Sequence, residues 1–387
     1  MKKITYSILL LLILLSTNSC VEEFNAATVE FEDTIVIEAT ITNELKHQKI
    51  LLSRTHKLKE DGPNHESGAT ITVTTSSNTT YTFHETEPGV YLSDIQFSAQ
   101  PSNNYQLSIT SNNGREYRSQ PTELTSNAST IENVYTIRET SEDGIDGIVI
   151  YVDSFDPTNN SKYYGYEFEE TYKIIAPRWV PNGFFITNHN PFRWTIAPRI
   201  QEERVCYNTV NSFGRLTTNT TLLSEDRISK FPIKFIPLDD IRISSRYSIL
   251  LKQYTQSAQA YNFYETLNDL STSESLLSQN QPGFIAGNIF SPSNPNEKVL
   301  GFFEVSSVAQ QRIFFNRSDY TNEFFFADWH CYKNPFQDEP TAFKISQKRI
   351  IYFSGGMLPG TSPVVVSRPC GDCTYFGPNI KPNFWID

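Results

Sequence analysis

The sequence predicts a mainly β fold, in which an immunoglobulin-like β-sandwich is followed by a larger β-rich domain with at least one helix. Three observations lead to this class. Short segments rich in Val, Ile, Thr, Tyr and Phe recur between turns throughout the 387 residues, and 13% of the residues are aromatic. A clear helical spacing of apolar side chains occurs at residues 257–270. The length exceeds that of one typical domain, so we expect two domains.

The first domain is predicted to span residues 32–125. About seven short strand-like segments lie in this range, among them the β-branched segment 34–41 and the alternating segment 69–74. The dipeptide Asn113-Gly114 is a strong signal for a hairpin turn. This number and spacing of strands are typical of an immunoglobulin-like sandwich, although the cysteine and tryptophan core of antibody domains is missing.

The second domain is predicted to span residues 130–387. Segments with the alternation or the β-branched composition of strands occur there at 148–152, 163–172 and 241–254. One helix is expected at about 257–270, where Tyr261 and Tyr264 recur at helical spacing and Ser257 can cap the N-terminus.

Residues 174–199 combine several prolines with many aromatic side chains, so we expect a long irregular excursion from the core. Exposed aromatic rings there can stack on a sugar or pack against a partner protein, whereas the commoner role of such rings is to fill a core. The candidates for an aromatic contact surface are Trp179, Phe184, Phe185 and Trp194.

Residues 1–19 have the layout of a secretory signal peptide. Two lysines precede an unbroken apolar run from Ile8 to Leu15, and small or polar residues follow. The run is too short for a transmembrane helix, which needs about 20 apolar residues. Cys20 stands where a bacterial lipobox has its acylated cysteine, so we expect residues 20–31 to form a lipid anchor and tether. The alternative is ordinary signal cleavage beside an incidental cysteine.

Charge gives information about location and partners. Glu22 and Glu23 follow the lipobox cysteine and resemble the surface-export signal of Bacteroidota lipoproteins, although acidic residues are also common in solvated linkers. The formal net charge of −11 becomes −13 once the two lysines of the signal peptide are removed. No Lys/Arg cluster stands out, so nucleic acid is not an expected partner. We expect a protein of the outer membrane that is exposed at the cell surface.

Beyond Cys20 the sequence has the cysteines Cys206, Cys331, Cys370 and Cys373. An even number in an exported protein predicts disulfides, but four cysteines allow three connectivities, and the sequence does not choose among them. A zinc site lacks a second close pair, and a redox dithiol needs a helix that the prolines near the C-terminus disfavour. We expect Cys370 and Cys373 to be oxidised, with at least one bond to Cys206 or Cys331, so that the aromatic tail is tied to the second domain.

Known catalytic signatures are missing from the sequence. It has no HExxH pair, no GxSxG elbow, no P-loop and no dinucleotide fingerprint. Neighbouring carboxylates such as Glu169-Glu170 would point to opposite faces of a strand, so they do not form a catalytic pair. We therefore expect a non-enzyme without a cofactor or metal, and an unrecognised glycan hydrolase is the lesser alternative.

Several segments, taken in order along the chain, resemble one family. They are the lipobox, IVIEATITN, DGIVIYV, YYGYEFEETY, AGNIF, VLGFFEVSS and CGDCTYFGPNIKPNFW. Together they resemble the Bacteroidota outer-membrane lipoproteins of the domain-of-unknown-function family four-two-four-nine. The resemblance implies association with TonB-dependent receptors and implies no catalytic residues.

The anchor and the resemblance together predict a surface-exposed lipoprotein that works as a non-catalytic partner of a TonB-dependent receptor. It would capture ligand, act as a lid or serve as an accessory subunit of the receptor barrel. The alternative is a structural accessory of an outer-membrane assembly, secretion or adhesion complex.

Overall fold

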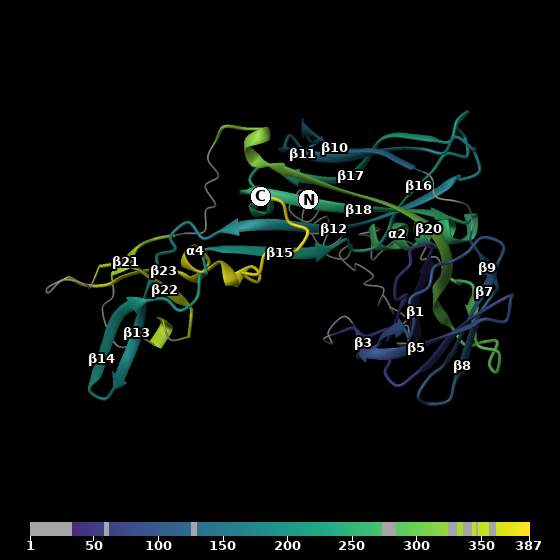
Figure 1. Ribbon diagram of the computed structural model, residues 1–387, viewed down its shortest axis with the longest axis horizontal. Coiled ribbons are helices and arrows are strands. Elements are labelled where there is room, and N and C mark those ends of the chain that lie inside the picture. The colour runs from purple at the N-terminus through teal and green to yellow at the C-terminus, as the bar shows by residue number, and fades with distance from the viewer. Residues whose placement is uncertain are drawn as a thin grey trace, which may run out of the picture.

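The computed structural model describes most of the chain after residue 32. The described residues are 33–57, 62–124, 130–272, 284–323, 331–335, 343–345, 347–355 and 361–387. The predicted signal peptide, Cys20, Glu22 and Glu23 lie outside these ranges, so lipidation and surface export stay predictions. Figure 1 shows two β-rich bodies and an arm that projects from one of them. Within the described ranges, each helix is too short or too polar to cross a bilayer.

The N-terminal body is an immunoglobulin-like sandwich, as the sequence predicts. Its strands are β1 (Ile35–Thr42), β2 (Lys49–Arg54), β3 (Asn64–His65), β4 (Thr70–Thr75), β5 (Thr80–Glu87), β6 (Val90–Ser93), β7 (Asn104–Thr110), β8 (Glu116–Ser119) and β9 (Thr122–Glu123). Hydrogen bonds join them in the order β1-β2-β6-β5 on one side and β4-β7-β8 on the other, and the β4–β5 hairpin links the two sides. This is the strand order of a constant-type immunoglobulin domain.

Two strands from the second half of the chain complete the N-terminal core. The strand β19 (Ile289–Phe290) pairs with β8, and β20 (Val299–Asn316) runs parallel to β1. The buried cluster of the sandwich includes side chains of these two strands, namely Ile289, Val299, Phe303 and Val305. The range 32–125 therefore does not close this core by itself.

Asn288 connects the two added strands. Its side-chain carbonyl accepts the Phe303 N–H at 2.7 Å, and its side-chain NH₂ donates to the Phe303 carbonyl at 2.8 Å. Its backbone carbonyl accepts the Gln120 N–H at 2.8 Å. One buried amide side chain thus satisfies both backbone groups of a buried residue of β20, which would be costly to leave unpaired.

The second body is another sandwich, built on the other half of β20. One sheet comprises β10 (Thr130–Thr140), β11 (Asp146–Phe155) and β17 (Arg227–Pro237). The facing sheet has the order β15 (Val205–Asn211), β12 (Tyr163–Ile175), β18 (Arg246–Gln256) and β20, with β16 (Leu216–Asn219) beside β12. The inner faces of the two sheets form one core, which includes Ile148, Ile150, Tyr164, Tyr166 and Ile249.

Two local predictions are wrong in part. Residues 174–199 do leave the core, but they are not irregular, because β13 (Asn182–His189) and β14 (Phe192–Pro198) form an antiparallel hairpin with one register shift between Ile186 and Asn188 and with its prolines at the strand ends. The strand expected at 241–254 begins late, because an aspartate caps a 3-10 turn, η1 (Ile241–Ile243), before β18. In the hairpin, prolines mark the ends of a strand, and before β18 the polar Asp240 marks the start of a turn. The composition of these segments did not show where the strands begin and end.

The helix that the sequence predicts is present as α2 (Ala258–Thr272). The Ser257 hydroxyl accepts the Ala260 N–H at 3.1 Å and so caps the first turn. Ala260 and Phe263 are buried against Phe302 of β20. The helix is therefore attached to the strand that both sandwiches share.

The arm consists of the β13–β14 hairpin and a small sheet near the C-terminus (Figure 1). Its remaining elements are β21 (Asn334–Pro335), β22 (Ile350–Ser354), β23 (Val364–Ser367), the one-turn helix α4 (Arg368–Gly371) and the 3-10 turn η3 (Cys373–Tyr375). A further 3-10 turn, η2 (Arg317–Asp319), follows β20. Segments far apart in the sequence therefore meet to form the arm.

A buried arginine ties strands of the second sandwich to α2. Arg215 pairs with Glu304 of β20 and, at 2.8 Å, with Glu167 of β12. Its guanidinium carbon also lies 4.0 Å from the ring centre of Tyr254 and 4.5 Å from that of Tyr264. Burial alone would lower the pKa of Arg215, but the neighbouring carboxylates, Glu304 first, raise it well above its ordinary value. A charge this deep is tolerable only because it is paired.

We expect Arg215→Met to lower the free energy of unfolding by about 3–5 kcal/mol, because it leaves Glu304 buried without a compensating charge. Equilibrium unfolding in urea, followed by circular dichroism, measures this loss. Arg227→Met is the matched control, since Arg227 pairs with Glu132 at the surface and should cost about 1 kcal/mol or less. A loss no larger than that of the control would contradict the proposed role of the buried pair.

Candidate functional site

The four cysteines beyond Cys20 form two disulfides at the base of the arm. Cys206 is bonded to Cys373, and Cys331 is bonded to Cys370, with S–S distances of 2.01 and 1.98 Å. The prediction that Cys370 and Cys373 are oxidised, with at least one bond to Cys206 or Cys331, is confirmed, and the structure has two such bonds. Since each of these sulfurs is bonded to another sulfur, none is free to bind zinc or to act as a dithiol.

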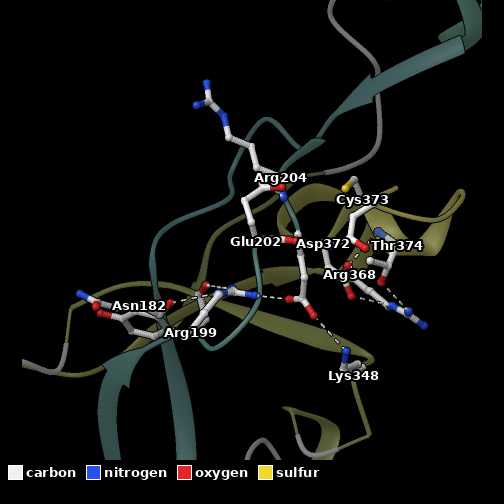
Figure 2. Close-up of polar contacts among 12 residues, drawn as sticks. Asn182, Arg199, Glu202, Arg204, Lys348, Arg368, Asp372, Cys373 and Thr374 are labelled. Carbon is white, nitrogen blue, oxygen red and sulfur yellow. Dashed lines mark hydrogen bonds and ion pairs between the residues drawn. The ribbon is translucent and has the colours of Figure 1, made fainter. Parts of the chain in front are cut away.

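The CGDC motif lies on two successive turns, α4 and η3. The sequence disfavours a helix here because of its prolines, but Pro369 lies in the first turn of α4, where a missing N–H costs nothing. Between the cysteines, the fully buried Asp372 accepts the Thr374 N–H at 2.8 Å and the Thr374 hydroxyl at 2.5 Å. It also pairs with Arg368 at 3.1 Å (Figure 2). These bonds fix the turn from which both cysteines project.

The chain beyond η3 wraps around the edge strand β15. Cys373 lies on one face of this strand, bonded to Cys206, and Trp385 lies on the other, with its ring centre 5.0 Å from that of Tyr207. Between them, the Tyr207 N–H donates to the Pro378 carbonyl at 2.9 Å. Trp385 is only 5% exposed. The tail therefore covers an edge strand whose backbone groups would otherwise be open to another chain.

A groove of about 320 Å³ lies at the base of the arm, between the β13–β14 hairpin and β22. Its volume falls within the range of small-ligand sites, roughly 300–1,000 Å³. Apolar side chains make up much of its lining, among them Phe184, Phe185, Ile345, Ile351 and Tyr352.

Three charged side chains form a network in this groove (Figure 2). Arg199 Nη1 donates to one carboxylate oxygen of Glu203 at 2.7 Å, and Lys348 Nζ lies 3.1 Å from the other. Arg199 also donates to the Asn182 carbonyl at 3.2 Å, and the Glu203 carbonyl accepts the Cys373 N–H at 2.9 Å. The Arg199 side chain is 10% exposed, whereas that of Lys348 is 55% exposed. The arginine pair is therefore a fixed part of the wall, and the lysine is free to turn toward a ligand.

The four predicted aromatic contact residues do not share one exposed surface. Trp179 packs against the core of the second sandwich. Phe184 is buried in the arm, with its ring centre 5.1 Å from that of Trp194. Phe185 is exposed at 38% and lines the groove. The aromatic residues therefore divide between core packing, which is the commoner role of such rings, and one ring that faces solvent.

The sequence did not indicate the charged network, because Lys348 lies 145 residues from Glu203. The four-residue spacing of Arg199 and Glu203 was a local signal for their ion pair. The spacing alone could not predict the pair, because it depends on the turn that the chain makes after β14. The described residues that line the groove include no His, Cys or Ser. In the described ranges, no group of three or more His, Cys, Asp or Glu could hold a metal ion.

We expect Cys206→Ser combined with Cys373→Ser to lower the free energy of unfolding by about 2–5 kcal/mol and to release the tail. Limited proteolysis with mass spectrometry should then cut after η3, where the native protein resists. Cys331→Ser with Cys370→Ser is the matched control, because that bond spans 39 residues instead of 167 and should cost less. Equal protection of residues 376–387 in both double variants would contradict the role assigned to the longer crosslink.

Comparison with known proteins gives little beyond the family. No curated protein matches the sequence. Among solved structures, a DUF4785 family protein from Legionella pneumophila subsp. pneumophila str. Philadelphia 1 is 9% identical, with a TM-score of 0.18, over 58% of this chain. The match spans 53% of the Legionella chain. A TM-score this low supports no transfer of structure or function.

The family comparison is more informative. The model described as "Domain of unknown function (DUF4249)" matches residues 21–312. This range contains the N-terminal sandwich, the β13–β14 hairpin and α2, and it ends within β20, before Cys331, Cys370 and Cys373. Because the match covers well over half of the sequence, the chain belongs to the DUF4249 family, a family of unknown function.

Proposed function

We propose that the mature chain is a lipid-anchored protein of the bacterial outer membrane, exposed at the cell surface, that acts as a non-catalytic partner of a TonB-dependent receptor. The anchor rests on Cys20 and the signal peptide before it, and surface exposure rests on Glu22 and Glu23. The resemblance to Bacteroidota lipoproteins supports the choice of partner. The protein would capture ligand, cover the barrel or complete it as an accessory subunit.

The observation that carries the proposal is the projecting arm. Large apolar or aromatic side chains are exposed on the segments that build it, namely Phe185, Ile200, Tyr332, Phe343 and Tyr375. Single exposed apolar side chains are ordinary on a protein surface and lie elsewhere on this molecule too, among them Phe213 and Leu222. The five on the projecting arm are the proposed anchors, because a projecting element is the part that can reach into another protein.

Crosslinking makes the arm suited to docking. The Cys206–Cys373 bond ties it to β15, and the Cys331–Cys370 bond holds its small sheet together. A surface that is already ordered loses little conformational entropy on binding, so more of the contact energy appears as affinity. The arm can therefore contact a barrel without first having to fold.

A glycan hydrolase is the weaker alternative, because Glu167 and Glu304, two carboxylates that lie together, are both paired with Arg215. Burial would raise the pKa of Glu167, but the charge of Arg215 and the hydrogen bonds from Arg215 and Tyr254 outweigh burial, and the pKa is lowered. A glycosidase general acid needs a raised pKa, so that it carries a proton at neutral pH. Glu167 and its neighbour Glu304 instead form ion pairs with one arginine.

We expect the tagged native protein, purified from its own membranes in mild detergent, to bring down a β-barrel receptor. Phe185→Ser combined with Ile200→Ser should reduce the recovered barrel at least about tenfold, since exposed anchors dominate such interfaces. Phe213→Ser combined with Leu222→Ser is the control, because these side chains are fully exposed outside the arm. If no barrel is recovered with the native chain at its natural abundance, the proposal is wrong.

Deletion of the gene separates the receptor partner from a structural accessory. A receptor partner should be needed for growth on a particular nutrient. A structural accessory of an assembly, secretion or adhesion complex should instead affect export or envelope integrity on every carbon source.

A further inference from the structure

A second groove lies between α2, β20 and residues 285–288, which precede β19. Figure 1 shows α2 and β20 well apart from the arm. The volume of this groove is about 370 Å³, which is also in the range of small-ligand sites, roughly 300–1,000 Å³. Gln259 and Asn262 of α2 line one wall, and Gln120 and Gly287 line the other. Segments from the first sandwich, the helix and the shared strand thus meet around it.

This groove offers hydrogen bonds without charge. The described residues that line it include no Asp, Glu, Lys, Arg or His. The side-chain amides of Gln120, Gln259 and Asn262 each carry two N–H donors and one acceptor oxygen. In the part of the chain that the structure describes, none of these three amides has a hydrogen-bond partner. Each is therefore available to donate to one ligand hydroxyl and to accept from another.

Aromatic rings form the floor of the groove. The ring centres of Phe263 and Phe302 lie 5.5 Å apart, with their planes tilted by 37°. Phe263 is 7% exposed and Phe302 is 5% exposed, so both rings are held in the core and only a small part of each reaches the groove. A sugar ring has a face of C–H groups and a rim of hydroxyls. C–H groups of such a ring can contact the exposed parts of the two phenylalanines, while the rim hydroxyls reach the surrounding amides.

The wall opposite α2 is held rigidly. A Cβ at Gly287 would lie 1.7 Å from the Gly301 carbonyl oxygen, so the wall runs directly against the backbone of β20 and tolerates no side chain there. Beside it, the Asn288 amide is held by both backbone groups of Phe303. Since the wall cannot retreat, hydrogen-bonding groups on the two sides keep a constant spacing, which favours one ligand shape over others.

We propose that this groove binds a neutral saccharide unit, of the size of a monosaccharide or disaccharide. A phosphate or carboxylate ligand would need a cationic side chain, and the lining has none. A purely apolar ligand would leave the three amides without partners, which is costly once water is excluded. A ligand that combines many hydroxyls with an apolar face satisfies both requirements. This inference does not depend on the receptor partnership.

Saturation-transfer NMR and calorimetry with the mature, disulfide-bonded protein test the inference. The probes are glucose, galactose, mannose, N-acetylglucosamine, maltose and cellobiose, with glucuronic acid and glucose 6-phosphate as charged comparisons. We expect at least one neutral sugar to bind. Gln259→Leu combined with Asn262→Leu should weaken that binding at least about tenfold, because two amides that contact the sugar are lost. Leucine favours helix, so α2 should remain intact.

Gln96→Leu is the matched control, since it makes the same change at an exposed glutamine of the first sandwich outside the groove. It should bind sugar as the native protein does. Three results would overturn the proposal: no binding of any neutral sugar, equal binding by the double variant, or tighter binding of the two charged sugars than of their neutral counterparts. Circular dichroism of each variant excludes loss of folding as the reason for a lost signal.

Discussion

The rest of the structure depends on the shared strand β20. Residues 299–306 pair in parallel with β1, and residues 307–316 pair in antiparallel fashion with β18, so one continuous strand belongs to both sandwiches. The approach of β20 to β1 requires a glycine, because Gly301 has φ +147° and a Cβ there would lie 2.1 Å from the Ile37 carbonyl oxygen. Glu304 lies near the point where the two halves of β20 meet, and it forms an ion pair with the buried side chain of Arg215. Neither sandwich is complete without this strand.

Local patterns in the sequence predicted much of the fold, and long-range pairing accounts for what they missed. The alternation in residues 34–41, the helical stripe after Ser257 and the even cysteine count each depend on near neighbours or on composition, and each corresponds to an element of the structure. The role of β20 depends on a partner strand more than 250 residues away. The hairpin at 182–198 was hidden because its prolines look like breaks in structure until the strand pairing shows that they lie at its ends.

Local sequence patterns also could not predict the two grooves. The one beside the arm combines apolar rings with a fixed Arg199–Glu203 pair, and the one beside α2 has amides and no charge. Neither set of residues is contiguous, so no motif could have indicated it. The arm and α2 lie well apart in Figure 1, so a partner seated on the arm does not have to cover the α2 groove. Contact with a protein and capture of a small ligand are therefore compatible on one chain.

The wrapped tail has a consequence for the order in which the protein assembles. The edge strand β15 stays uncovered until the residues around Trp385 have been synthesised and have packed against it. In the same way, β1 has no partner on its second side until β20 has been synthesised. Contacts between distant segments slow folding, because the entropy of loop closure is lost before the contacts form. In a chain that is synthesised N-terminus first, the first sandwich waits longest for its partner strands. Its sheet edges stay open until the last segments have been made, and those segments close them.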